Sequence, residues 1–464
     1  MTDCTLDRPA SPTTARLAAL GNWMRDHQRA LRLTQWCVVV FYLVLVALPA
    51  FLPLPGNESR ILNNVTVFSQ FLFWGIWWPF VLLSMILVGR TWCGVFCPEG
   101  ALSEWASRHG RGAPVPRWAK WGGWPFVAFC LTTVFGQLVS VYQYPKAVLL
   151  ILGGSTVGAM VIGYLYGKGK RVWCRHLCPV NGVFGLLSRL SPFYMQVDRK
   201  RWAVEPGRKV IPINCAPLVD IRRMEGPSEC HMCGRCADHR GAVQLAARAP
   251  NREIAQLRAE QGSGWDLLLL VYGLMGVAVG AFQWTSSPWF ISAKQTAAEW
   301  LIERDILWPL SDNAPWWLLT HYPENSDVFT WLDGAMIVAY IGSVAVLLGT
   351  WVLAWLAASA RVLPGSWRAN TIKLSYALTP LAGCGVFLGL SALTVSILKA
   401  EGLTFHWIAQ ARMTLLTLAA LWSWWLAWRQ MQPQGPLRAL AGAVLLVPAL
   451  AAVVWAWALL FVIW

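Results

Sequence analysis

Nine long apolar stretches dominate this 464-residue chain and limit what it can fold into. A helix of about 20 apolar residues crosses the ~30 Å hydrocarbon core of a bilayer. The few charged residues within the stretches stand near their ends, so each stretch is typical of a membrane-spanning helix. The predicted spans are 31–53, 67–88, 124–142, 147–166, 265–284, 331–357, 374–397, 411–428 and 440–463. The sequence therefore predicts an all-α polytopic membrane protein with about nine transmembrane helices.

The charge distribution predicts how the chain is oriented. Charged residues make up 13% of the chain, against roughly 25% in soluble proteins. The net charge is +15, and 32 of the 38 Lys and Arg fall in segments on one side of the predicted spans. Because positive residues concentrate in cytoplasmic loops, we expect a multi-pass protein with a cytoplasmic N-terminus and a periplasmic C-terminus. The basic excess then faces anionic lipid headgroups, and no nucleic-acid partner is expected.

The chain divides into four predicted segments. Residues 1–30 are a cytoplasmic tail, and residues 31–198 form a four-helix membrane unit. Residues 199–264 form a small cytoplasmic segment with ferredoxin-like cysteine spacing. Residues 265–464 form a five-helix membrane domain with an outer loop at 285–330.

One string, Arg-x-Trp-Cys-x3-Cys-Pro, occurs twice, at 90–98 and 171–179, each time after a pair of predicted spans. Two thiols four residues apart lie on one face of a helical turn. A duplicated two-helix unit would bring both strings together beneath the inner leaflet, at a pseudo-twofold axis. Four such thiols can hold an iron–sulfur cluster or another soft metal, or cycle between dithiol and disulfide, which the reducing cytoplasm disfavours. They are Cys93, Cys97, Cys174 and Cys178.

A third cysteine group, at 230–236, has the spacing Cys-x2-Cys-x2-Cys. Three thiolates so spaced bind a [4Fe–4S] cluster in bacterial ferredoxins, whereas structural zinc sites favour two separate Cys-x2-Cys pairs. Ferredoxin runs continue with x3-Cys-Pro, but Arg240 and Gly241 stand there, so the fourth ligand lies elsewhere. Cys215 is our first choice and His239 the alternative. The predicted ligands of this cluster are Cys215, Cys230, Cys233 and Cys236.

These motifs resemble those of the membrane polyferredoxins, a group that includes NapH-type, NosR-type and CcoG-type proteins. The resemblance covers about residues 67–241 and rests on the paired strings and the ferredoxin-type run. It implies [4Fe–4S] clusters on the cytoplasmic side of the bacterial inner membrane. It also implies an electron-transfer component rather than a stand-alone catalyst.

The chain departs from these relatives in three ways. It has one ferredoxin run rather than two, and it lacks the Ser/Thr-Gly-Ala-Thr motif that binds covalent flavin in NosR-type proteins, so no covalent flavin is expected. It also adds five C-terminal spans. An extended chain with a single run resembles the FtrD-type component encoded with bacterial ferrous-iron permeases. That resemblance implies a role in iron uptake, with an iron permease and a periplasmic cupredoxin as partners.

We therefore expect electron transfer between a quinone or external donor and a redox protein partner. The alternatives are an accessory protein that handles or reduces iron or copper, and a membrane redox sensor. No haem is expected, because all seven histidines lie outside the middle of the predicted spans. Three intramembrane amides either contact a quinone or bond a neighbouring helix, namely Gln70, Gln137 and Gln283. Basic residues near the ferredoxin run should favour its more negative, reduced state, namely Arg199, Lys200, Arg201, Arg222 and Arg223.

Overall fold

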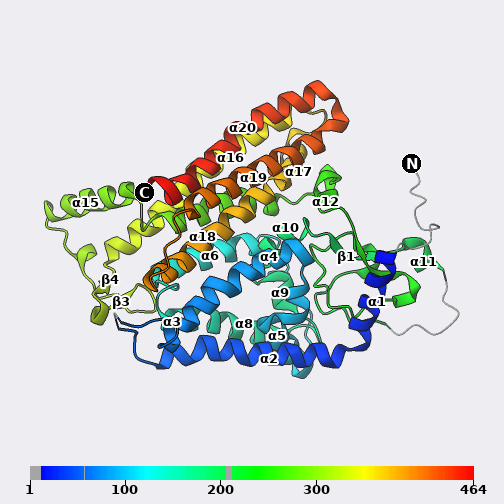
Figure 1. The fold of residues 1–464 in the computed structure, drawn as a ribbon, viewed down its shortest axis with the longest axis horizontal. Coiled ribbons are helices and arrows are strands. Elements are labelled where there is room, and N and C mark those ends of the chain that lie inside the picture. The colour runs from blue at the N-terminus through cyan, green and yellow to red at the C-terminus, as the bar shows by residue number, and fades with distance from the viewer. Residues whose placement is uncertain (1–11, 57, 205–211) are drawn as a thin grey trace.

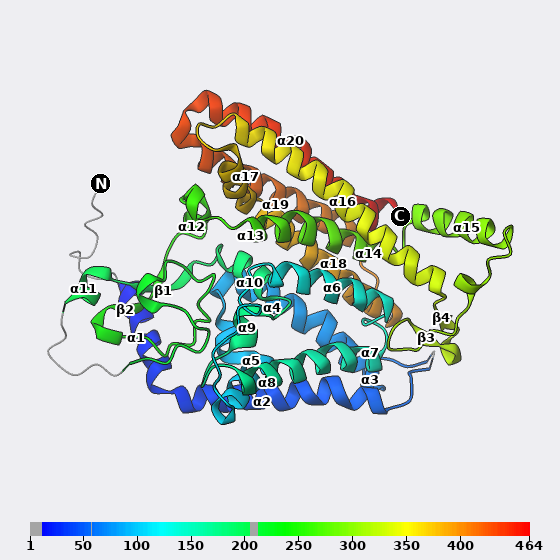
Figure 2. The ribbon, with the colours of Figure 1, turned by 180° about the vertical axis from the view of Figure 1, so that it is seen from behind.

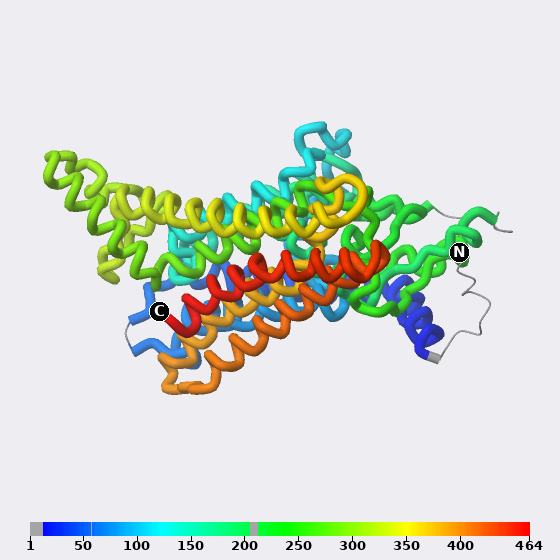
Figure 3. The backbone as a smooth tube through the Cα atoms, turned by 90° about the horizontal axis from the view of Figure 1, so that it is seen from above, coloured from blue at the N-terminus to red at the C-terminus, as the bar shows by residue number. Residues whose placement is uncertain are grey.

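The computed structural model describes residues 12–56, 58–204 and 212–464, and these form an elongated bundle of helices (Figure 1). The long helices run roughly along one direction, as the view from above also shows (Figure 3). Helix α1 (Pro12–Asp26), α11 (Arg199–Ala203) and the β1–β2 sheet lie at one end, which we call the α1 end. Helix α15 (Pro288–Ile302) and a second small sheet lie at the opposite end, the α15 end (Figure 2).

The N-terminal membrane unit is built from the first spans and from short helices between them. Asn64 caps the second span, because its side chain accepts hydrogen bonds from the amides of Thr66 and Val67. This span contains a π-helical segment at Phe71–Trp77. The helices of the unit are α2 (Gln28–Ala47), α3 (Val65–Gln70), α4 (Trp78–Val88), α5 (Pro98–His109), α6 (Trp124–Leu138), α7 (Pro145–Val148), α8 (Gly154–Leu165), α9 (Val172–His176) and α10 (Asn181–Ser188).

A small sheet closes the cysteine-rich segment that follows. Strands β1 (Phe193–Val197) and β2 (Val243–Ala247) pair antiparallel, with Phe193 opposite Ala247. Helix α1 packs on this sheet, since Gly21 lies against Leu245. Arg25 forms an ion pair of 3.0 Å with Asp238. Residues 12–26, which the sequence predicts as part of a tail, therefore form a docked helix. Residues 1–11 of that predicted tail lie outside the described residues.

The remaining elements form the C-terminal half. Thr330 and Asp333 form a capping box at the start of its longest helix. The elements are α12 (Arg252–Ala255), α13 (Gly264–Leu268), α14 (Ala278–Gln283), β3 (His321–Tyr322), β4 (Asp327–Val328), α16 (Trp331–Arg361), α17 (Trp367–Ser375), α18 (Thr379–Ala400), α19 (Ile408–Met431) and α20 (Pro436–Ala458). A π-helical segment at Leu269–Val277 joins α13 to α14.

Within the described ranges, seven helical segments are long and apolar enough to cross a membrane. They are Gln28–Phe51, Val65–Val88, Pro145–Leu165, Gly264–Gln283, Trp331–Arg361, Trp367–Ala400 and Pro436–Ile463. The predicted class, an all-α polytopic membrane protein, is confirmed, but the count of nine is not. The predicted span 124–142 falls on α6, which has only 15 residues. The span 411–428 falls on α19, where Arg412 and several tryptophans lower the mean hydropathy.

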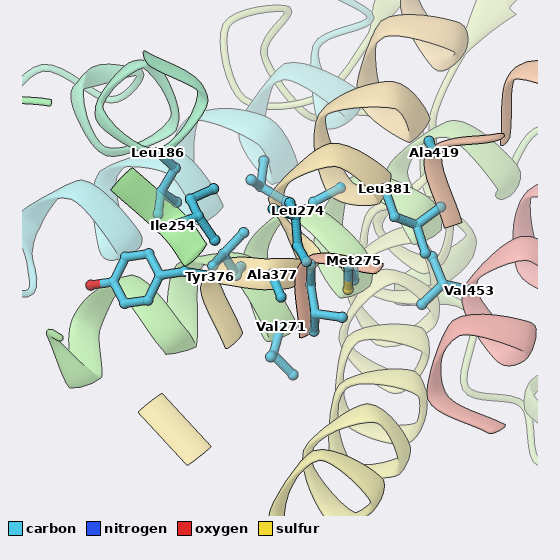
Figure 4. Close-up of a cluster of buried hydrophobic side chains, with 14 of the residues drawn as sticks. Leu186, Ile254, Val271, Leu274, Met275, Tyr376, Ala377, Leu381, Ala419 and Val453 are labelled. Carbon is cyan, nitrogen blue, oxygen red and sulfur yellow. The ribbon is translucent and has the colours of Figure 1, made fainter. Parts of the chain in front are cut away.

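The two membrane units share one hydrophobic core. Figure 4 shows part of it, where side chains from the N-terminal unit, from α12 and from the C-terminal helices meet. Leu186 of α10 lies beside Ile254 of α12, and both belong to the same cluster as the C-terminal helices. The other labelled residues are Val271, Leu274, Met275, Tyr376, Ala377, Leu381, Ala419 and Val453. The cysteine-bearing unit therefore packs directly against the C-terminal half.

Candidate iron–sulfur centres

The first cysteine string turns back into the helical bundle. Helix α4 ends at Val88, and Gly89 then adopts φ +64°, a conformation that glycine reaches without strain. The chain reverses, and the indole of Trp92 packs on Trp77 with 5.0 Å between ring centroids. Trp77 lies in the middle of the segment Val65–Val88. The string is thus re-entrant, and differs from the predicted loop beneath the inner leaflet because the glycine reverses the chain.

The second string meets the first inside the bundle. Glu99, just after the first string, bonds Ser155 near the middle of the segment Pro145–Leu165. The indole of Trp173, in the second string, donates to the same Glu99 carboxylate over 3.3 Å. The thiol of Cys97 lies within electrostatic range of Cys93 and Cys174, and that of Cys178 within range of Cys97 and Cys174. We call the four cysteines of the two strings the intrabundle site.

The ferredoxin-type run and Cys215 form a second group, which we call the loop site. Cys215, Cys230, Cys233 and Cys236 line one small cavity together with apolar side chains such as Met195. Burial raises the pKa of Cys230 to about 12 and also raises the pKa of Cys215 and of Cys236. The neighbouring thiols raise these pKa values further, in keeping with the cavity that the four cysteines share.

His239, the alternative fourth ligand, lies elsewhere. Its imidazole packs against the ring of Trp202, at a centroid distance of 5.3 Å. Burial lowers the pKa of His239, with a further contribution from the charge of Arg240. The described residues that line the cavity of the loop site include Cys215 but not His239. The geometry therefore favours Cys215 as the fourth ligand.

The two sites touch each other through both strings. In the first string, Gly94 packs so closely on the loop site that a Cβ there would lie 1.9 Å from the carbonyl oxygen of His231. In the second string, the amide of Arg171 donates to the carbonyl of Ala216 over 2.7 Å. Gln28 of α2 adds a hydrogen bond of 3.0 Å to the carbonyl of Cys233. The loop site thus lies directly against the intrabundle site, on the side of the α1 end.

Two buried arginines stand between the sites. Arg90 and Arg171 hold the same position in the two strings, and they are only 3% and 1% exposed. Arg171 lies within electrostatic range of Cys97 and Cys174 of the intrabundle site and of Cys233 of the loop site. Arg90 lies within electrostatic range of Cys174 of the intrabundle site and of Cys230 of the loop site. Each arginine therefore acts on both cysteine groups.

These arginines also carry unused donors. In the part of the chain that the structure describes, Nε of Arg90 and Nη2 of Arg171 are buried without a hydrogen-bond partner, as is Nδ1 of His231 beside Cys230. Buried polar groups normally have partners, so the two orphan guanidinium donors and the unpaired His231 ring nitrogen call for partners near the cysteines. The sulfur atoms of iron–sulfur clusters accept such hydrogen bonds. The residues at both sites therefore fit clusters with negative charge.

Glu104 of α5 links Arg171 of the second string to Arg235, which lies beside the loop site. Its carboxylate accepts hydrogen bonds from Nε of Arg171 at 2.9 Å and from Arg235, which lies between Cys233 and Cys236, at 2.8 Å. Arg108 is its third partner. Burial alone would raise the pKa of Glu104, but the charges of the arginines hold it at about 2.

No group of three or more His, Cys, Asp or Glu in the described ranges has the spacing expected around one metal ion. A [4Fe–4S] cluster binds each thiolate through a different iron, so its ligands are spaced more widely than those of a single ion. The assignment of clusters therefore rests on the motifs, the shared cavity and the unpaired buried nitrogen atoms.

The three intramembrane amides bond protein groups. Gln70 donates to the carbonyl of Gln143, and Gln283 donates to the carbonyl of Ala456. Gln137 accepts from the indole of Trp284 over 2.8 Å. Each amide therefore joins neighbouring segments, which is one of the two roles predicted from the sequence.

The basic residues that the sequence singled out for tuning the charge lie far more exposed than the two arginines of the repeated strings. The residues expected to do this, Arg199, Lys200, Arg201, Arg222 and Arg223, are all exposed, so solvent screens their charges. Arg90 and Arg171 were visible in the sequence only as fixed positions of the repeated string. The repetition itself, at an offset of 81 residues, was the signal that could have found them.

The apolar helices define a multi-pass membrane protein, and the motifs of its two cysteine sites are typical of iron–sulfur proteins. A family described as "4Fe-4S binding domain" matches residues 70–116 and 149–195, so each half of the match contains one cysteine string. The chain is therefore similar to this domain over these two ranges, which agrees with its resemblance to membrane polyferredoxins.

Two curated relatives support this relationship. The chain is 26% identical to a protein named "Putative electron transport protein YccM" of Escherichia coli (strain K12), over 43% of this chain and 62% of the relative. It is 24% identical to the "Ferredoxin-type protein NapH" of Haemophilus influenzae (strain ATCC 51907 / DSM 11121 / KW20 / Rd), over 34% of this chain and 62% of the relative. The matched region thus spans about three fifths of each relative, at 62%. No solved structure matches the chain significantly.

Proposed function

We propose that the protein transfers single electrons in the bacterial inner membrane, between a quinone or external donor and a redox protein partner, and that the intrabundle and loop sites hold its clusters. The observation that carries this proposal is the direct contact between two sites of four cysteines each. Gly94, next to Cys93, packs on His231, next to Cys230, and Arg171 and Arg90 are buried within electrostatic range of both sites. Such proximity suits electron exchange between two centres.

The side chains have distinct tasks in this proposal. The cysteines of each site would hold one cluster, as thiolates do in ferredoxins. A bound [4Fe–4S] cluster supplies reversible one-electron chemistry. Arg90 and Arg171 offset negative charge on the thiolates and offer hydrogen bonds to their surroundings. Apolar side chains such as Val219 and Met224 exclude water from the loop site.

The orientation and partners are part of the same proposal. Outside the long loop 167–264, 15 Lys and Arg fall in the predicted inner segments and 6 in the predicted outer ones, so the positive-inside rule supports a cytoplasmic α1 end and a periplasmic C-terminus. The loop site would then face a cytoplasmic partner. The resemblance to FtrD-type components extends the proposal to ferrous-iron uptake with an iron permease and a periplasmic cupredoxin.

Anaerobic purification provides the test. We expect iron and inorganic sulfide in equal amounts, with two distinct EPR signals on stepwise reduction. Cys233→Ser should remove one signal and Cys93→Ser the other, while Cys37→Ser, at an exposed position of α2, should keep both. Copper or zinc without sulfide would overturn the proposal in favour of a metal-handling role. Intact clusters that exchange electrons with neither quinol nor a protein partner would instead favour a redox sensor.

A further inference from the structure

Aromatic rings in contact lead away from the intrabundle site toward the α15 end. Trp92, next to Cys93, lies 5.0 Å from Trp77 between ring centroids. Trp77 lies 6.1 Å from Phe73, and Phe73 lies 5.0 Å from Trp74. Trp74 lies 4.6 Å from Tyr142. These separations fall in the range of favourable aromatic pairs, so the rings form one continuous series.

The two ends of the series lie at different depths in the bundle. Trp92 belongs to the re-entrant string, beside the middle of the second span. Tyr142 lies in the turn between α6 and α7, next to exposed Gln143. Figure 2 shows α7 beside α3 and near β3, toward the α15 end. The series therefore covers the part of the bundle between the cysteines and that end.

Three of the rings come from an unusual stretch of backbone. Phe73, Trp74 and Trp77 all lie in the π-helical segment Phe71–Trp77. A π-helix is rare and is frequently found at functional sites. Its wider turn changes which side chains share a face, so Trp74 can face Tyr142 while Trp77 faces Trp92.

These rings do not lie where a membrane protein usually places tryptophan. Aromatic belts lie at the two membrane–water interfaces. Phe73 and Trp74 are instead 4% and 7% exposed, and they occupy the middle of a span. An interfacial anchoring role therefore does not explain them.

We propose that Trp92, Trp77, Trp74 and Tyr142, with Phe73 between the last two tryptophans, form an electron path between the intrabundle site and the α15 end. This inference rests on the proposed electron-transfer function. Indole and phenol rings have loosely held π electrons, and rings in contact couple more strongly than saturated side chains. Electron tunnelling weakens steeply with distance through saturated material, so a replaced ring should slow it.

The proposed reaction is the transfer of one electron, and it is balanced. One electron leaves a one-electron donor at the α15 end, and that donor is oxidised. The intrabundle site gains the same electron and is reduced. No bond forms or breaks, and no proton moves. The path removes the need for a further cofactor between the cysteines and that end of the bundle.

The experiment uses the full chain in liposomes selected by a tag on the C-terminus, which lies at the α15 end (Figure 1). Dithionite, a low-potential anionic reductant that crosses bilayers only slowly and delivers single electrons, is added outside. Stopped-flow absorbance then follows reduction of the clusters. Trp74→Leu breaks the series, Trp74→Phe keeps a ring there, and Trp351→Leu, at an exposed position of α16, is the matched control.

We expect Trp74→Leu to slow reduction from outside several-fold, with Trp74→Phe partly restoring it and Trp351→Leu unchanged. Iron and sulfide content and reduction by dithionite in detergent should stay at the wild-type level, which separates this result from misfolding. Tyr142→Leu breaks the series at its outer end and should slow reduction if Trp74 variants fold poorly. Equal rates in Trp74→Leu, Tyr142→Leu and wild type would overturn the path. A wild-type protein without clusters would instead overturn the proposed function.

Discussion

Gly94 and His231 are in direct contact, and a Cβ added to Gly94 would lie 1.9 Å from the His231 carbonyl oxygen. The backbone amide of Cys233 is also within 3.0 Å of that position, so no flexible side chain can move aside. Gly94→Ala should therefore push the loop site away from the bundle. We expect it to lower the free energy of unfolding by roughly 1–3 kcal/mol, as overpacking does. Tryptic cleavage of the segment 212–264 should become faster, and the loop-site EPR signal should weaken.

Gly154→Ala is the matched control for this substitution. Gly154 begins α8, and nothing lies within 4 Å of the position that its Cβ would take. The alanine there should leave proteolysis and both EPR signals unchanged. Equal behaviour of Gly94→Ala and Gly154→Ala would contradict the contact between the two sites.

Loss of a buried arginine should lower the reduction potentials of both sites. Arg171→Met removes a positive charge that lies within range of Cys97, Cys174 and Cys233. A positive charge favours the more negative reduced state. We expect a change of about tenfold in the reduction equilibrium, or about 59 mV for one electron. Potentiometric titration followed by EPR measures this shift.

Arg201→Met is the comparison for the arginine prediction. Arg201 lies near the loop site in sequence, but its side chain is 63% exposed and screened by solvent. Its removal should leave both potentials nearly unchanged. Arg171→Lys retains the charge but loses donors, so a partial shift would separate the contribution of charge from that of hydrogen bonding.

The fourth ligand of the loop site can be identified by substitution. Cys215 shares a cavity with Cys230, Cys233 and Cys236, whereas His239 packs on Trp202. Cys215→Ser should therefore abolish the loop-site EPR signal and lower the iron and sulfide content. His239→Ala should keep both the loop-site EPR signal and the wild-type content of iron and sulfide. The reverse pattern would assign the ligand to His239.

Glu104 should make the protein sensitive to acid. The arginines around it hold its pKa at about 2, below the ordinary value of 4.5. Its ionised form therefore stabilises the fold above pH 4.5, and this contribution is lost as the pH falls from 4.5 toward 2. At neutral pH, Glu104→Gln leaves Arg171 buried without its counter-charge. This should lower the free energy of unfolding by roughly 3–5 kcal/mol.

Thermal unfolding in detergent tests this prediction. The midpoint of Glu104→Gln should be lower than that of wild type at neutral pH. The gap should narrow as the pH falls below the ordinary pKa of the carboxyl group, because the wild type then loses the same charge. Glu303→Gln, in an exposed position at the end of α15, should have little effect. A gap that stays constant with pH would argue against an ionised Glu104.

The fold class followed from the sequence because apolar runs in a bilayer have few alternatives to helices. The repeated string also predicted that Cys93 and Cys174 would meet. Hydropathy alone did not settle the number of spans, since α19 combines Arg412 with several tryptophans. The length of α6 depends on the turn at Val139 and Ser140, which local composition did not predict.

Contacts between distant segments account for what sequence reasoning missed. The re-entrant path depends on Gly89 and on the packing of Trp92 against Trp77. The docking of α1 depends on Arg25 meeting Asp238. Neither contact leaves a periodic signal in the chain. The charge of Arg171 is visible in the sequence, but its burial is not.

The duplicated string has a consequence for how such a protein is built. Each copy supplies half of the cysteines of the intrabundle site and one of the two buried arginines. A chain with a single copy would assemble an equivalent centre only by pairing with a second molecule. Joining both copies in one polypeptide replaces that encounter with an intramolecular one, so complete sites form at any concentration of the protein.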